Sequence, residues 1–252
     1  MRVASLGSGS RGNATLIQTA DACVLVDCGF PVRETERRLA GRGVDPAALT
    51  ALLVTHEHSD HLSGVLPLAR RYRVPVYMTA GTARAARPRA GDPVELLGAG
   101  DRMSLCGLAI EAVEVPHDAR EPVQYIFAAG GIRFGVLTDL GSVTPHVIDR
   151  YRHCDALLLE ANHDRDLLAT GVYPPALKRR VGGDWGHLSN CQAAQLLQRL
   201  AGGALRQLVI GHVSRQNNSP DHVRAALGPV TGSIERTLYA DQDNGFGWLS
   251  LS

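Results

Sequence analysis

The sequence predicts an α/β protein in which two β-sheets pack face to face and helices cover their outer sides. Short apolar segments rich in β-favouring residues recur along the whole chain, and polar or glycine-rich turns separate them. Segments with helical spacing follow strands in both halves of the chain, as expected for helices packed outside sheets. Histidine and aspartate residues directly follow several apolar segments, which assigns the chemistry to the ends of strands.

Length and composition favour one intracellular domain. The 252 residues are compatible with a single domain over 1–252. The formal net charge is +1, so any surface that binds phosphate must be local. Five cysteines without a C-x-x-C pair predict a reduced, cytoplasmic protein. Neither a signal peptide nor an apolar run of roughly 18 residues is present, so we expect no membrane partner.

The N-terminal part is predicted to contain strands at 3–6, 15–19, 23–27 and 51–55, and a helix over 31–42. The loop over 7–13 is rich in Gly, Ser and Asn. It either binds an oxyanion or simply makes a hairpin turn. Asp27 ends a strand, where it either orients a metal-bound histidine or caps a turn.

The stretch over 52–61 carries the strongest signal in the chain. Its polar residues are His56, His58, Asp60 and His61. Neighbouring side chains of an extended strand point in opposite directions, so a bend must bring these imidazoles to one point. Ser59 is the expected N-cap of a helix over 61–71. Imidazole and carboxylate are ligands of zinc, manganese and iron, so this stretch predicts a metal site.

Further strands and helices are expected in the middle of the chain. They are strands at 74–78, 103–106, 108–115, 123–128, 132–137 and 156–159, helices at 80–86 and 144–151, and a polar loop at 84–93. Gly107 and the pair Gly130 and Gly131 predict two hairpin turns. His117 and Asp139 each follow one of these strands, as the histidines of the first cluster do.

Turn and capping signals predict the C-terminal part. The expected elements are two short helices flanking 173–175, a helix over 189–200, a strand over 207–210, a helix from 219–220, and a closing hairpin of 237–240 and 246–251. Ser189 and Gln192 form a capping box. The turn over 243–245 has the sequence D-N-G, which favours a hairpin. His212 follows the strand over 207–210.

Seven residues in this order resemble the metal ligands of the metallo-β-lactamase superfamily. They are His56, His58, Asp60, His61, His117, Asp139 and His212. The resemblance spans nearly the whole chain and implies a four-layer αββα sandwich with metals at one edge of the sheets. The motifs over 8–13, 55–61, 116–119, 138–141, 160–164, 186–190 and 211–218 look like those of the YycJ/WalJ type, regarded as double-strand DNA exonucleases. RNase Z and PhnP-type phosphodiesterases are similar more distantly, and the chain lacks a long insertion resembling the tRNA-gripping arm of RNase Z.

The resemblance implies two divalent ions, zinc or manganese, with iron as a further alternative. One ion would be bound by His56, His58 and His117. The other would be bound by Asp60, His61 and His212, and Asp139 would bridge both. His117 and His212 are alternatively structural histidines. Two ions about 3.5–4 Å apart can hold a hydroxide that attacks phosphorus.

Two residues are predicted to be catalytic. His187 lies just before a capped helix N-terminus, where an anion is favoured. The resemblance implies that it protonates the leaving oxygen, and the alternative is a histidine in a solvent loop beside Trp185. Asp60 is a second candidate, as a proton acceptor besides binding metal.

Substrate contacts are expected from polar residues near the predicted ligands, with polar turns or metal-site support as the alternative. They are Ser10, Asn13, Asn162, His163, Arg215, Asn217 and Asn218. The basic runs 178–180 and 70–71 either extend a phosphate track or are solvated faces.

The resulting hypothesis is a metal-dependent phosphodiesterase that hydrolyses nucleic acid, a double-strand DNA exonuclease. A small-molecule (cyclic) phosphodiesterase, or a thioester or lactam hydrolase, could use the same metals. A binding module without catalytic activity is the alternative from another class, and it should hold fewer than two ions. The oligomeric state is left open.

Overall fold

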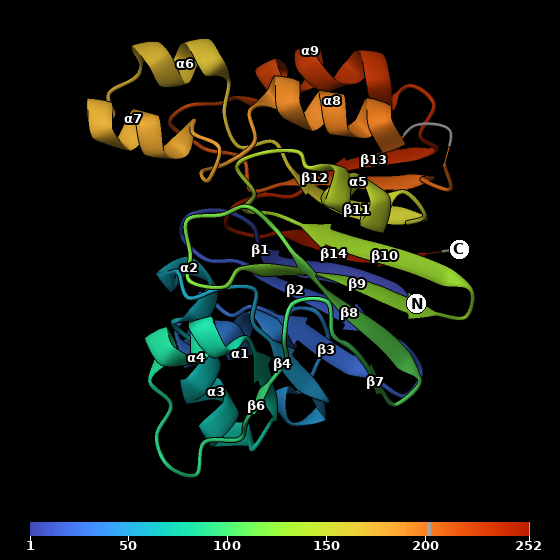
Figure 1. Ribbon diagram of the computed structural model, residues 1–252. Coiled ribbons are helices and arrows are strands. Elements are labelled where there is room, and N and C mark those ends of the chain that lie inside the picture. The colour runs from blue at the N-terminus through green and yellow to red at the C-terminus, as the bar shows by residue number, and fades with distance from the viewer. Residues whose placement is uncertain (201–202, 252) are drawn as a thin grey trace. The chain divides into compact units, whose positions relative to one another are not determined.

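The computed structural model describes residues 1–200 and 203–251, and these residues form two compact units (Figure 1). The first unit consists of Met1–Glu114, Ala119–Ile132 and Ala240–Ser252. The second consists of Val115–Asp118 and Arg133–Tyr239. That the whole chain is one domain stays a prediction. No helix in the described part of the chain is both long and apolar enough to cross a membrane.

The first unit is built on a mixed sheet with the strand order β14-β1-β2-β3-β4-β5-β6. The strands are β1 (Arg2–Gly7), β2 (Ala14–Gln18), β3 (Cys23–Val26), β4 (Ala51–Leu53), β5 (Val76–Met78), β6 (Val94–Leu96) and β14 (Phe246–Ser250). Pairing is antiparallel from β14 to β3 and parallel from β3 to β6. The parallel strands β3 and β4 therefore end at the same edge of the sheet, and they deliver Asp27 and the histidine stretch there.

Three further strands of the first unit pair antiparallel: β7 (Arg102–Leu105), β8 (Leu108–Glu114) and β9 (Val123–Ala129). The predicted turn at Gly107 is confirmed. Leu105 pairs with Leu108 across Cys106 and Gly107, whose φ angles are 48° and 79°, as a two-residue turn with positive φ requires. On β9, the Tyr125 hydroxyl donates to the Val54 carbonyl at 2.8 Å, which fixes the chain just before the histidine stretch.

Helices cover the outer face of the first sheet. They are α1 (Val32–Ala40), the short 3₁₀ helix η1 (Pro46–Ala48), α2 (Ser59–Leu62), α3 (Val65–Tyr72) and α4 (Ala80–Ala86). Leu39 of α1 and Leu68 of α3 are fully buried and share one apolar cluster with Leu25 and Leu52 of the sheet. This core holds the strand ends that carry the polar residues.

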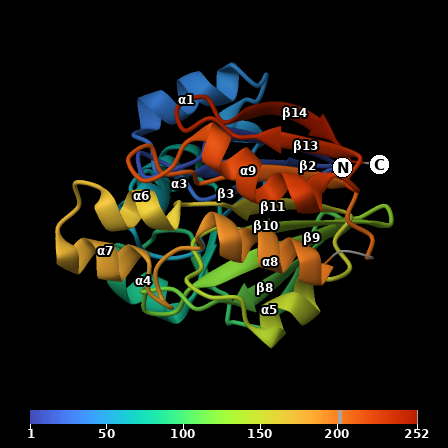
Figure 2. The same ribbon diagram turned by 90° about the horizontal axis from the view of Figure 1, so that it is seen from above.

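The second unit contains four parallel strands, β10 (Ile132–Leu137), β11 (Ala156–Glu160), β12 (Gln207–Gly211) and β13 (Arg236–Tyr239). Its helices are α5 (Pro145–Tyr151), α6 (Arg165–Thr170), α7 (Pro175–Val181), α8 (Asn190–Leu200) and α9 (Pro220–Thr231). α8 and α9 run side by side over the strands (Figures 1 and 2). β11 and most of β10 and β12 are buried, which explains their nearly continuous apolar sequences, whereas β13 at the edge is partly exposed.

The capping predictions of the second unit are confirmed. The Thr144 hydroxyl accepts from the Val147 N–H at 3.2 Å and begins α5. The Ser189 N–H donates to Gln192 Oε1 at 3.0 Å, which completes the capping box at the start of α8. The Ser219 hydroxyl caps α9 by accepting from the His222 N–H at 3.3 Å.

Two predictions around the histidine stretch are wrong. The helix expected over 61–71 is two helices, α2 and α3, separated at Gly64. The Gly64 N–H donates to the Cys28 carbonyl at 2.7 Å and so leaves the helical hydrogen-bond pattern. A Cβ at Gly64 would lie 2.0 Å from the Phe30 carbonyl oxygen, so only glycine fits there. Ser59 is the first helical residue, and the N-cap position is held by His58 without a side-chain cap.

The predicted C-terminal hairpin is also wrong. β13 pairs with β12, whereas β14 pairs with β1. The D-N-G turn itself forms, because Asp241 Oδ1 accepts from the N–H groups of Asp243 and Asn244. β12 and β1, the strands with which β13 and β14 pair instead, are largely buried. The short strand β6 was not predicted, because its three partly exposed residues show no clear periodicity.

Candidate metal and catalytic residues

In the first unit, a buried aspartate orients a buried histidine. Asp27 Oδ2 lies 2.8 Å from His61 Nδ1. The same carboxylate accepts from the N–H and the hydroxyl of Thr55, each at 2.8 Å. Burial raises the pKa of Asp27, and the contacts with His61 and Thr55 act in the opposite direction. With Nδ1 facing a carboxylate, Nε2 is the ring nitrogen of His61 that can bind a metal.

His56 and His58 turn two ring nitrogens toward each other. His56 Nδ1 lies 2.9 Å from the Thr55 hydroxyl, and His56 Nε2 lies 3.0 Å from His58 Nδ1. Two nitrogens bound to one zinc ion are about 3.0–3.4 Å apart, because each Zn–N bond is about 2.0–2.1 Å long. The pair therefore has the donor atoms and the spacing that one ion requires.

Asp60 and His61 form a second pair in the same unit. Asp60 Oδ2 lies 3.5 Å from His61 Nε2. The Asn13 amide nitrogen lies 3.2 Å from Asp60 Oδ2 and 3.0 Å from His61 Nε2. Asn13 was predicted to contact substrate, and in the structure its buried side chain contacts these two candidate ligands. Ser10, from the same loop, is exposed.

In the second unit, three side chains converge. Asp139, His187 and His212 each place one possible ligand atom within 4.8 Å of the other two. His212 Nδ1 lies 3.0 Å from Asp139 Oδ2, and His187 Nδ1 lies 3.7 Å from Asp139 Oδ1. An oxygen and two nitrogens at this spacing fit a divalent metal.

Glu160 organises this second group, and it was missed from the sequence. Its Oε1 accepts from the N–H groups of Leu140 and Leu188, at 2.9 and 3.0 Å. Its Oε2 lies 3.1 Å from His187 Nδ1 and 3.8 Å from His212 Nδ1. The signal was available, because Glu160 is fully buried and directly ends an apolar strand, as the predicted ligands do.

His117 belongs to the second unit and is held by the loop before His187. Its Nδ1 donates to the Gly186 carbonyl at 2.9 Å, which leaves Nε2 as the nitrogen that can bind a metal. Its ring centroid lies 5.3 Å from that of His187. The ring is buried, its Nδ1 faces a backbone carbonyl, and Asp118 Oδ1 lies 3.5 Å from its Nε2.

Three residues near the strand ends have a left-handed backbone. The φ angles of Asp27, Asp139 and His212 are 59°, 54° and 50°. Asp27 and His212 directly follow β3 and β12, and Asp139 is the second residue after β10. Such angles are uncommon without glycine, and strain of this kind concentrates at functional sites. The other non-glycine residues with positive φ in the described chain are Arg73 and Arg87, at helix ends, and Cys106, in a hairpin turn.

The other predicted contact residues divide into two kinds. Asn162 and Asn218 hold the chain together, because Asn162 Nδ2 donates to the His212 carbonyl at 3.1 Å and Asn218 Nδ2 donates to the Ala161 carbonyl at 2.9 Å. His163 Nδ1 and the side-chain amide of Asn217 are buried without a hydrogen-bond partner in the described chain. Burial lowers the pKa of His163 to about 4. Arg215 is exposed.

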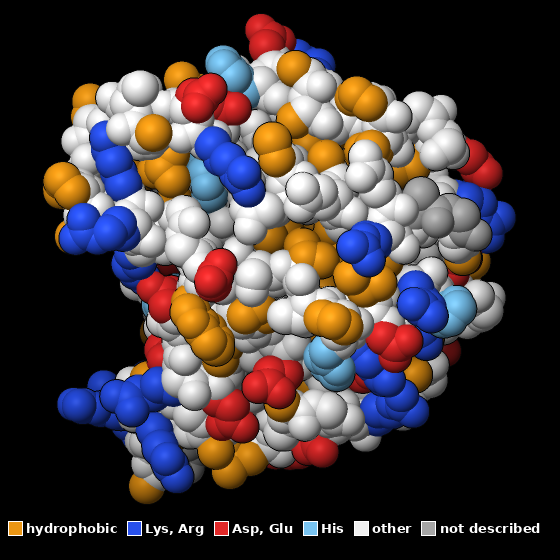
Figure 3. All heavy atoms as spheres, turned by 45° about the horizontal axis from the view of Figure 1, so that its top comes forward, with side chains coloured by type: hydrophobic (Ala, Val, Ile, Leu, Met, Phe, Trp, Pro, Cys, Tyr) orange, Lys and Arg blue, Asp and Glu red, His pale blue; other side chains and the backbone are white. Residues whose placement is uncertain are grey.

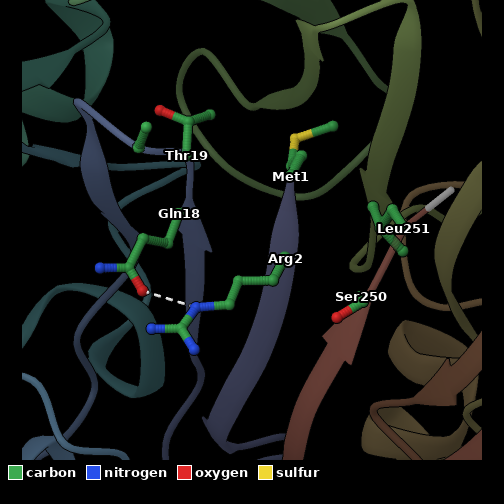
Figure 4. Close-up of a pocket in the computed structure, with 7 residues that line it drawn as sticks. Met1, Arg2, Gln18, Thr19, Ser250 and Leu251 are labelled. Carbon is green, nitrogen blue, oxygen red and sulfur yellow. Dashed lines mark hydrogen bonds between the residues drawn. The ribbon is translucent and has the colours of Figure 1, made fainter.

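A surface pocket of about 330 Å³ lies at the ends of β1, β2 and β14 (Figure 4). Its lining residues are distant in sequence from the candidate metal and catalytic residues. Arg2 points across it and donates to Gln18 Oε1 at 2.8 Å. The guanidinium of Arg2 also lies 4.2 Å from the ring centroid of Trp248. None of the predicted site residues line this pocket, so it has no part in the chemistry below.

A family model described as a beta-lactamase superfamily domain matches residues 23–213. That range contains all of the predicted metal ligands. The chain belongs to the metallo-β-lactamase superfamily.

Curated relatives cover most of the chain. The exodeoxyribonuclease WalJ of Streptococcus pneumoniae serotype 2 is 35% identical over 219 residues, 84% of this chain and 81% of that protein. The exodeoxyribonuclease YycJ of Bacillus anthracis is 32% identical over 229 residues, 89% of this chain and 87% of that protein.

Solved structures of the superfamily superpose over nearly the full chain. The metallo-β-lactamase fold protein YhfI from Bacillus subtilis has a TM-score of 0.76 at 17% identity and covers 99% of both chains. A diphosphatase of the PhnP family has a TM-score of 0.70 at 20% identity and covers 99% of this chain and 97% of its own. The predicted fold class is therefore confirmed.

Proposed function

We propose that this protein is a metal-dependent phosphodiesterase that hydrolyses nucleic acid, acting on double-stranded DNA as an exonuclease. The observation that carries the proposal is an imidazole, His187, paired with the carboxylate of Glu160 at 3.1 Å beside the possible metal ligands Asp139 and His212. The relatives named exodeoxyribonucleases, which match over most of the chain, supply the substrate class.

The donor sets described above fit divalent metal ions. We assign His56, His58 and His117 to one ion, Asp60, His61 and His212 to a second, and Asp139 to both. When bound, such ions act as Lewis acids that neutralise charge on a phosphate and make water a stronger acid. Ring nitrogens and carboxylate oxygens suit zinc and manganese alike, and metal analysis of the purified protein identifies the ion.

The chain's own groups handle the protons. Glu160 Oε2 faces His187 Nδ1 and stabilises the imidazolium, so that His187 Nε2 can donate its proton to the leaving oxygen of the phosphodiester. His187 is 21% exposed, whereas Glu160 is fully buried, so the ring can reach a substrate while its partner stays fixed. Asp60, also 21% exposed, is suited to accept a proton.

A local basic patch supports a polyanionic substrate. We define it by Arg84, Arg87 and Arg120, which are exposed and form no salt bridge within the described residues. Lys and Arg side chains gather over α4 and the loop after it, at the lower left of Figure 3. A Cβ at Gly81 of α4 would lie 3.1 Å from Arg120 Cβ, so Arg120 is next to α4. With a net charge of +1, phosphate binding depends on such local patches.

We also place the protein in the cytoplasm. All five cysteines are free thiols. Burial raises the pKa of Cys154 to about 12 and those of Cys23 and Cys28 to about 11, so these three are unreactive structural thiols. The absence of disulfides among them agrees with a reducing compartment.

The proposal is tested by a degradation assay. End-labelled double-stranded DNA, single-stranded DNA and RNA are compared with bis-p-nitrophenyl phosphate, using protein loaded separately with Mn²⁺ and Zn²⁺. Progressive shortening of duplex DNA from one end is the expected result. Cleavage of the small diester alone would replace the nuclease by a small-molecule phosphodiesterase. Protein that binds fewer than two ions and cleaves nothing would be a binding module.

A further inference from the structure

The loop over 182–186 presents a tryptophan to solvent just before His187. Trp185 is 63% exposed. The other tryptophan, Trp248, is partly buried, and its Nε1 donates to the Arg42 carbonyl at 2.8 Å. Indole rings are enriched where proteins bind partners, since they offer a large rigid apolar face. No packing role in the described fold accounts for the exposed ring of Trp185.

The backbone on both sides of Trp185 is held in place. The His187 N–H donates to the Val181 carbonyl at 2.9 Å, and the Gly186 N–H donates to the Gly183 carbonyl at 2.9 Å. The Gly186 carbonyl in turn accepts from His117. The exposed ring therefore sits on a short, anchored loop.

Two glycines make this anchoring possible. A Cβ at Gly141 would lie 2.4 Å from the Asp184 carbonyl carbon, and one at Gly186 would lie 2.1 Å from the Arg180 carbonyl oxygen. The loop thus packs against two other segments with no room for a side chain between them. Because the backbone is already ordered, binding at Trp185 costs little backbone conformational entropy.

The charged residues near Trp185 favour one kind of ligand group at the ring and another at the last turn of α7. Asp184 is exposed beside Trp185, and its carboxylate disfavours a phosphate at the ring itself. The last turn of α7, directly before the loop, carries Lys178, Arg179 and Arg180. Arg180 is paired with Asp118, while Arg179 is exposed. The ring thus suits an uncharged aromatic group, and the turn before it suits a phosphate.

We propose that Trp185 stacks on a nucleobase at the end of a nucleic-acid strand and thereby positions the adjoining phosphodiester near His187. This inference rests on the proposed nuclease function and assigns its preference for nucleic acid over small diesters to one side chain. Every base has an aromatic face, so the contact is tolerant of sequence. Trp185 is a positioning residue that takes no part in proton transfer.

Fluorescence tests the contact without turnover. In a Trp248→Phe variant, Trp185 is the only indole. The probe is a DNA duplex with phosphorothioate linkages, which resist hydrolysis, and the matched duplex has abasic terminal nucleotides. The base-bearing probe should quench the emission of Trp185, and the abasic probe should not, although anisotropy reports that both bind. Equal quenching by both probes, or binding without quenching, overturns the proposal. So does an emission change that depends on protein concentration alone, since a second copy would then cover the ring.

Kinetics supply the second test. Trp185→Ala should raise KM for DNA by about five- to hundredfold, the range that loss of one stacked base gives, and should leave kcat nearly unchanged. Trp185→Phe should restore most of the loss because it keeps an aromatic face. A substrate with an abasic end should not distinguish the variants. Equal KM values for Trp185→Ala and the parent on ordinary DNA contradict the inference.

The two proposals fail in different ways. If the parent protein degrades no nucleic acid, the proposed function is wrong. If it degrades DNA and the Trp185 variants behave like the parent, only the role of Trp185 is wrong. If Trp185→Ala does not fold, Trp185→Phe and the fluorescence titration still test the role of Trp185.

Discussion

Each unit contains an imidazole whose Nδ1 faces a buried carboxylate, and the two pairs differ in the exposure of the ring. In the first unit, Asp27 faces His61, and both side chains are almost completely buried, at 4% and 0% exposure. In the second unit, Glu160 faces His187, whose side chain is 21% exposed. A buried ring can bind a metal but cannot exchange protons with a substrate, whereas an exposed one can do so. In the function proposed above, the same pairing serves metal binding in one unit and proton transfer in the other.

The largest expected effect comes from removing the exposed ring. His187→Ala should lower turnover on phosphodiesters by about 10²–10⁴-fold and leave the fold and metal content unchanged. Asp139→Ala is the matched variant from the same group, and it should lose metal as well as activity. Metal analysis and initial rates measure both. Near-normal turnover of His187→Ala would refute the proton-donor role. Loss of metal would instead make His187 a ligand, which its position near Asp139 and His212 allows.

Amide variants of Asp27 and Glu160 test whether the two carboxylates have different roles. Asp27→Asn keeps a residue that tolerates a positive φ but turns an amide toward His61 Nδ1, so metal affinity should fall by about 10–100-fold. Glu160→Gln should lower kcat and leave metal affinity nearly unchanged. Chelator competition and steady-state kinetics separate these outcomes. Equal losses of metal in both variants would show that the two carboxylates have the same role.

His163 is also buried, but no carboxylate of the described chain faces its Nδ1, and this residue should make the protein sensitive to acid. The pKa of His163 is lowered by burial from 6.5 to about 4, so the unfolded chain binds a proton more readily than the folded one. The contribution of neutral His163 to the free energy of unfolding is fully present above about pH 6.5. It is lost progressively as the pH falls toward 4. Between pH 7.5 and pH 5 the contribution lost is roughly 1–2 kcal/mol.

His163→Gln tests that contribution in denaturant titrations at both pH values. The variant should show a loss of stability between pH 7.5 and pH 5 that is smaller than the parent's by this amount. His146→Gln, at an exposed position, is the control and should retain the parent's pH dependence. An unchanged pH dependence in His163→Gln would show that His163 does not titrate in this way.

The smallest expected effect concerns surface charge. Arg87→Gln in the basic patch should weaken DNA binding about equally for all sequences and reduce the slope of log K against log salt by about 1. Arg180→Gln in the second unit should change the slope less, because Arg180 is already paired with Asp118. Fluorescence anisotropy over a salt series measures both slopes. If Arg180→Gln has the larger effect, the second unit is the main phosphate-binding surface.

The sequence predicted most strands and the helix caps of the second unit well, because these depend on local patterns. Ser189 and Gln192, for example, cap α8 as expected. Features that depend on distant segments were not predictable. The partner of β14 is β1, and at the break the Gly64 N–H donates to the distant Cys28 carbonyl. The role of Glu160 depends on Leu140 and Leu188, which donate to it from two separate loops.

The left-handed backbone at Asp27, Asp139 and His212 bears on how this protein can be improved in the laboratory. Glycine adopts that conformation without strain, so a glycine substitution that relieves backbone strain at these strand ends removes a side chain that we assign to the proposed metal site. A selection for stability alone would therefore reach inactive variants by short mutational routes. Selections for higher stability should keep these three residues unchanged and vary residues of the helices and loops instead.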